Sequence, residues 1–153
     1  MTKFLLAVHV LAAIVAVGPV TVAASMFPPI ARKALAAPDD SQALATTGLL
    51  HRICRVYAAV GVVVPVFGFA TASNMGVLGD TWLIVSIALT ALAAVVLAAL
   101  VLPRQSAILD AIPEGRGNRA ATVRLAMFTG IFNLLWATVT ILMIVRPGST
   151  TGA

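Results

Sequence analysis

Charged side chains are scarce in this sequence. Of its 153 residues, 10% are Asp, Glu, Lys or Arg, whereas 61% are hydrophobic. An ordinary soluble domain has about 25% charged residues and about 45–50% apolar residues. This chain has too few polar residues to cover a soluble domain. The sequence therefore predicts a protein that lies in a lipid bilayer.

Acidic residues are the scarcest charged type, with five in the whole chain, and all five lie outside the apolar runs or at their ends. A proton pump that depends on buried Asp or Glu is therefore disfavoured. So is an enzyme that uses paired carboxylates. The sequence also shows no nucleophile–base arrangement and no phosphate-binding loop, so it predicts no catalytic residues.

Aromatic residues make up only 6% of the chain, and no nucleic-acid-binding motif is present. The basic residues flank apolar runs. The net charge of +5 therefore does not indicate nucleic-acid binding. The single cysteine, Cys54, excludes an internal disulfide and leaves the redox compartment open.

What the sequence does contain is long apolar runs, and a membrane-spanning helix needs about 20 such residues. We expect four spans, at about residues 4–26, 53–73, 82–102 and 119–145, all within one integral membrane domain. Pro28-Pro29 is expected to end the first helix, and Pro103 the third. The runs are continuous rather than alternating, which disfavours strands. The predicted fold class is all-α, a four-transmembrane-helix antiparallel bundle.

Two helices are expected to begin outside the membrane. Asp39, Asp40 and Ser41 follow Pro38, and Asp or Ser can cap free backbone N–H groups. The second helix is therefore expected to extend into the cytoplasm from about residue 41. Asn118 is the corresponding cap for an early start of the fourth helix.

The basic residues predict the orientation, because Lys and Arg are retained on the cytoplasmic side. Eight lie in or beside the first and third connections, and only Lys3 and Arg146 lie near the chain ends. Both termini are therefore expected outside. The first apolar run is longer than the roughly 7–15 residues of a signal peptide core, so we interpret it as a helix.

One imidazole, His9, interrupts the first apolar run. At 1.5 Å per residue, Gly68, Ser86 and Thr140 fall at a similar depth in the outer half of the bilayer on the other three helices. We expect these residues to form a pocket around His9. Met143 and Met75 are close enough in sequence to the outer boundary to overhang that pocket.

Three roles for His9 stay open at this point. It can pin helices together by a hydrogen bond to Ser86 or Thr140, serve as a haem or metal ligand, or relay protons. As a ligand, His9 could share haem b with Met143, or copper with Met75. His51 lies about a membrane thickness away and cannot share one iron atom with His9.

Two further polar positions are notable. His51 and Cys54 lie on one side of a helix, but two ligands are too few for a structural zinc site. Their side chains are expected to reach the lipid headgroups. Asn133, in the middle of the fourth span, is expected to form an interhelical hydrogen bond.

Three segments carry a family resemblance: LLAVHVLAAIVAVGP, LLHRICRVYAAVGVVVPVFG and FTGIFNLLWATVTIL. They resemble the CopD-like superfamily of small bacterial membrane proteins, which includes copper-resistance proteins and HemJ-type protoporphyrinogen oxidases. The chain is most similar to an uncharacterised family of predicted integral membrane proteins in that superfamily. By resemblance to the HemJ-type members, His9 would bind haem. Those members also use a lysine in the third span, which this chain lacks, so the resemblance does not extend to oxidase activity.

The sequence as a whole predicts a multi-pass protein of a bacterial inner membrane, non-enzymatic or accessory, with a His9-centred pocket for haem or a metal. Two alternatives remain. One is a structural subunit that packs against a larger membrane protein or a second copy. The other is a small transporter, for which Asn133 and the mid-span prolines Pro19 and Pro65 are the motivation.

Overall fold

The computed structural model describes residues 1–149, and within them the chain forms helices and no strands. The helices are α1 (Thr2–Ala36), α2 (Ser41–Val60), α3 (Val63–Met75), α4 (Thr81–Val95), the π-helix η1 (Val96–Val101), α5 (Leu102–Ala111) and α6 (Arg119–Val145). Joined end to end, they make four rods that are long and apolar enough to cross a membrane. The prediction of four helices that are long and apolar enough to cross a membrane is thereby confirmed.

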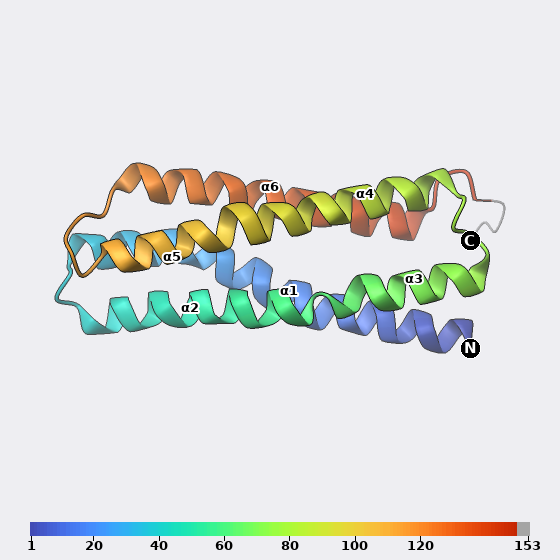
Figure 1. Cartoon of the computed structure of the whole chain (residues 1–153), viewed down its shortest axis with the longest axis horizontal. Helices are drawn as coiled ribbons and strands as arrows, with labels where there is room; N and C mark the ends of the chain where they lie inside the picture. The colour runs from blue at the N-terminus through green and yellow to red at the C-terminus, as the bar shows by residue number, and fades with distance from the viewer. Residues whose placement is uncertain (150–153) are drawn as a thin grey trace.

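The four rods lie along one long axis, and their connections alternate between its two ends (Figure 1). Connections 37–40 and 112–118 lie at one end, which we call the basic end because eight of the ten Lys and Arg residues lie in or near these connections. The start of α1, the 76–80 connection and the end of α6 lie at the opposite end (Figure 1).

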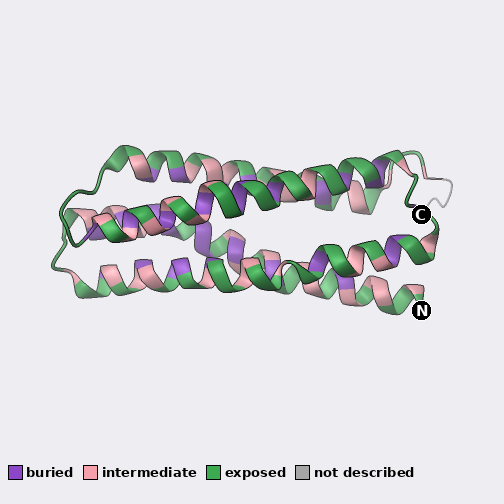
Figure 2. Cartoon of the chain, viewed as in Figure 1, coloured by how far each residue is buried: buried purple, intermediate pink, exposed green. Residues whose placement is uncertain are grey.

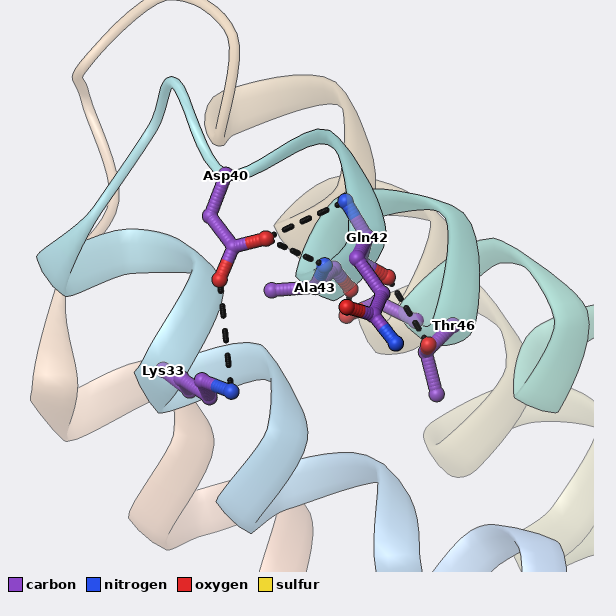
Figure 3. A network of polar contacts seen from close by, with 6 residues as sticks. Lys33, Asp40, Gln42, Ala43 and Thr46 are labelled. Carbon is purple, nitrogen blue, oxygen red and sulfur yellow. Dashed lines mark hydrogen bonds and ion pairs between the residues drawn. The ribbon is translucent and has the colours of Figure 1, made fainter.

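At the basic end, side chains cap the starts of two helices. The Asp40 carboxylate accepts hydrogen bonds from the backbone N–H groups of Gln42 and Ala43, at 3.1 and 3.0 Å, and lies 4.0 Å from the Lys33 ammonium (Figure 3). Asn118 accepts a 2.7 Å bond from Ala120 N–H at the start of α6. These bonds satisfy N–H groups that a helix leaves free in its first turn.

The prediction that Pro28-Pro29 and Pro103 end helices is wrong. Helix α1 continues through Pro19, Pro28 and Pro29 to Ala36, and the third rod continues past Pro103 to Ala111. A proline removes one helical hydrogen bond and crowds the carbonyl four residues earlier. Membrane helices tolerate this loss because neighbouring groups and local changes of helix type satisfy the freed backbone groups.

Two prolines show how the backbone adjusts. Just before Pro103 lies the six-residue π-helix η1, where the Leu102 N–H donates to the Leu97 carbonyl, five residues back. Pro65 lies four residues after Gly61 and cannot donate to the Gly61 carbonyl, which accepts a 3.1 Å bond from Val64 N–H instead. This local turn separates α2 from α3.

The interior has two apolar clusters. The larger joins α1, α2, η1, α5 and α6 towards the basic end and contains Phe27, Cys54, Val101 and Leu125, all fully buried. The smaller lies at the opposite end, around Trp82 and Leu83. In each rod, at most 28% of the most apolar window is buried, and exposed residues occur along every helix (Figure 2). Such apolar outer surfaces suit contact with lipid.

Truncating the larger cluster should destabilise the fold. In soluble cores Phe→Ala costs about 3–5 kcal/mol, but lipid also solvates apolar groups, so mainly lost packing contributes here. We expect F27A to lower the free energy of unfolding by about 2 kcal/mol, measured by denaturation from detergent micelles. The control L134A removes a side chain that is 70% exposed and should change the unfolding free energy very little.

Candidate functional site: two buried histidines and a polar hollow

His9 lies on α1 facing α3, and its side chain is 8% exposed. Its Nδ1 is 2.9 Å from the carbonyl oxygen of Val64. A carbonyl can only accept, so Nδ1 carries the proton and donates. A neutral His9 then has its lone pair on Nε2, and the bond from Nδ1 to Val64 is the hydrogen bond that this ring forms within residues 1–149.

Gly68 makes room for the His9 ring. A Cβ atom built at Gly68 would lie 2.8 Å from Cε1 and 3.2 Å from Nδ1 of the imidazole. Gly68 is four residues beyond Val64, so the ring lies over one turn of α3. The expected proximity of Gly68 to His9 is therefore present in the structure, and any larger residue there would move the ring.

Neither predicted hydroxyl partner bonds to His9. The Ser86 hydroxyl is buried and donates to the carbonyl of Trp82 at 2.7 Å. Thr140 is exposed, and its hydroxyl donates to the carbonyl of Trp136 at 2.9 Å. Both bonds stay within one helix, as is common for Ser and Thr. Of the roles left open for His9, a bond to Ser86 or Thr140 is not the one the structure shows, because His9 bonds to Val64 instead.

The two methionines expected near His9 belong to the smaller apolar cluster. Met75 and Met143 pack against Ala72, Val77, Trp82 and Leu83. Residues 1–149 contain no group of three or more His, Cys, Asp or Glu side chains placed to hold a metal ion.

The second histidine, His51, joins a buried network between α2 and α5. Its Nδ1 lies 2.9 Å from Oε1 of Gln105, and its Nε2 lies 3.2 Å from the Ser106 hydroxyl. The Gln105 amide also donates to Sγ of Cys54 at 3.6 Å. With Nδ1–H donating to Gln105 and Nε2 accepting from Ser106, a neutral imidazole uses both nitrogens.

The expectation that His51 and Cys54 reach the lipid headgroups is wrong, because both are buried in this network. Gln105 and Ser106 are not among the residues predicted from the sequence, because Pro103 was expected to end the third helix. The sequence does carry one signal for this network. His51 and Cys54 are three residues apart on one side of a helix, and two further polar residues, Gln105 and Ser106, follow Pro103.

A third polar region lies between α1 and α6. The Asn133 amide donates to the Ser25 hydroxyl at 3.1 Å, which confirms the expected interhelical bond. Beside this bond is a hollow of about 350 Å³. Its lining comprises Ser25, Pro28, Pro29, Arg32, Ala126, Thr129, Gly130 and Asn133. Two buried atoms in this lining, Thr129 Oγ1 and Asn133 Oδ1, have no hydrogen-bond partner among residues 1–149.

No protein-family model, no curated protein and no solved structure matches this chain.

Removing one member of the His51 network should leave the other members unsatisfied. A buried polar group that loses its partner costs about 1–3 kcal/mol. We expect Q105L to lower the free energy of unfolding in detergent by about that amount. The control Q42L changes an exposed glutamine at the start of α2 and should have a much smaller effect. Equal effects of the two substitutions would contradict a stabilising role for the network.

Proposed function

We propose that this chain is a small, non-enzymatic accessory protein of a bacterial plasma membrane that binds haem b through Nε2 of His9. The observation that supports the proposal is the geometry of the His9 imidazole. Nδ1–H donates to a backbone carbonyl, Gly68 leaves space for the ring, and Nε2 has its lone pair free. Metal-ligating histidines generally donate their other ring N–H in this way, which fixes the tautomer and ring orientation.

Haem fits a solitary imidazole better than a bare copper ion does. A haem iron already has four porphyrin nitrogens and, as in globins, needs one proximal histidine from the protein. Copper(I) depends on several soft ligands, and Met75, the expected thioether partner, lies in the smaller apolar cluster. We therefore favour haem over copper, with copper as the alternative that metal analysis distinguishes.

The proposal includes a topology. We infer an antiparallel bundle with both termini outside and the basic end in the cytoplasm, because of the distribution of Lys and Arg. His9 then lies in the outer half of the bilayer. A relationship to the CopD-like superfamily is part of the same proposal. Residues 82–102 of the third rod contain no lysine, so we do not extend the proposal to oxidase activity.

The test is to purify the full chain from haem- and copper-replete cells and record its absorption spectrum and metal content. The wild type should carry a haem absorption band, and H9A should lose it. H51A, which removes the other buried histidine, should keep the band. G68A should weaken haem affinity by about 10–100-fold, as substitutions behind a metal ligand do.

A wild type without haem, or an H9A variant with the same haem content, would contradict haem binding by His9. Copper at one atom per chain in place of haem, lost in H9A, would identify copper as the ligand.

A second candidate function is favoured by the hollow between α1 and α6. We propose that a helix of a larger membrane protein, or of a second copy, packs into this hollow against Thr129, Gly130 and Asn133. A Cβ atom at Gly130 would meet nothing within 4 Å, so there is space for a closely packed helix. Small residues and polar side chains are the features by which membrane helices associate.

Filling the hollow should block this association. We expect G130L to abolish crosslinking to a partner in native membranes, because the leucine side chain would occupy the space. G18L is the matched control, since a Cβ atom at Gly18 also meets nothing within 4 Å but Gly18 does not line the hollow. Crosslinking that persists unchanged in G130L would rule out this surface.

A further inference from the structure

Three arginines surround a second hollow at the basic end. This hollow, of about 290 Å³, lies between α5, α6 and the 112–118 connection. Its charged lining is Arg104 from α5, Arg116 from the connection and Arg124 from α6. The contacts described above for His9 and for Asn133 lie elsewhere, so neither proposed function accounts for this cluster of like charges.

The Arg104 guanidinium is held in place by two contacts. Its Nη1 donates to the carbonyl of Leu100 at 3.1 Å, and its Cζ lies 4.4 Å from the centre of the Phe128 ring. A carbonyl and an aromatic face orient the guanidinium without neutralising it. The positive charge of Arg104 therefore stays available to an anion in the hollow.

The other two guanidiniums add to this charge. Arg124 is exposed, and no ion pair to it is present among residues 1–149. Arg116 contacts the Glu114 carboxylate, which neutralises one of the three charges. The hollow thus keeps an excess of positive charge that its own side chains do not balance.

The lining of the hollow also has an apolar part. Ala107, Ile108 and Ala111 line it from one face of α5, and Ala121 lines it from α6. Leu35 of α1 packs so closely against Gly117 that no Cβ atom would fit there, which fixes the connection on the end of α1. A lining that combines arginines with apolar side chains suits an amphiphile with an anionic head.

The depth of the hollow distinguishes a lipid from a water-soluble anion. Arg146 lies 5.7 Å from the Trp82 ring at the opposite end, and Trp and Arg are typical residues of a membrane–water interface. Arg104 follows Trp82 by 22 residues, and Arg124 precedes Arg146 by 22 residues. At 1.5 Å per residue this is about 33 Å, close to the roughly 30 Å hydrocarbon thickness. With Trp82 and Arg146 at one interface, this spacing puts Arg104 and Arg124 at the level of the lipid phosphates at the other.

We propose that this hollow binds the phosphate of an anionic phospholipid, with Arg104 and Arg124 as its guanidinium ligands. Guanidinium groups bind phosphate oxygens through paired, charge-assisted hydrogen bonds. Basic pockets at helix ends are known to hold anionic lipid headgroups. The acyl chains would run along the apolar surface of the rods. The site is independent of haem binding at His9.

The test uses the full chain in nanodiscs of phosphatidylcholine with or without phosphatidylglycerol, with retained lipids counted by native mass spectrometry. The wild type should retain phosphatidylglycerol in preference to phosphatidylcholine. R124Q, which changes an exposed residue, and R104Q should each weaken that preference by about tenfold, which corresponds to about 1.4 kcal/mol. R124K should keep part of it, because the charge remains while the paired geometry is lost.

The matched control is R52Q/R55Q, which removes two exposed charges on α2 outside the hollow. It should retain phosphatidylglycerol like the wild type. An equal loss in this control would show that overall charge alone attracts the lipid and would overturn the proposal. Binding of inorganic phosphate in phosphatidylcholine nanodiscs, without enrichment of phosphatidylglycerol, would also overturn it by showing a site for a soluble anion.

Discussion

The structure depends on one constraint: in a bilayer, polar groups must find their hydrogen-bond partners within the protein, because the hydrocarbon contains no water. Four long helices meet this requirement for most of the backbone. The constraint is most visible where prolines remove N–H groups. At Pro65 the Gly61 carbonyl bonds to Val64 instead, and before Pro103 the helix widens into a π-helix. The rods thus continue where a soluble helix would be expected to stop.

The same constraint decides which side chains connect the rods. Lipid tails do not drive apolar helices together, so specific contacts matter more than hydrophobic burial. His9 bonds α1 to α3, His51 bonds α2 to α5, and Asn133 bonds α6 to α1. Both histidines and the asparagine therefore have structural partners. His9 differs from His51 in that one of its ring nitrogens has no described partner, which supports its proposed role as a ligand.

Some of this was predictable from the sequence and some was not. The apolar runs predict the rods, since length and hydropathy are sufficient to identify a span. Asp40 and Asn118 were predictable as caps because their roles depend on near neighbours in the chain. Proline was misleading, because its helix-breaking rule is derived mainly from helices in water. Gln105 and Ser106 were missed as a consequence, since they follow Pro103. The Val64 carbonyl could not be predicted as the partner of His9, because a backbone acceptor has no signature in the sequence.

The π-helix η1 has an effect on everything that follows it in the third rod. A π-turn accommodates about one more residue than an α-turn, and one residue of an α-helix corresponds to about 100° of rotation. The wider turn therefore sets the angular position of α5 about its own axis. The adjacent residues Arg104 and Gln105 depend on it: one faces the arginine-lined hollow and the other faces His51. Six apolar residues without a functional group of their own thereby set the direction of both polar side chains at the basic end.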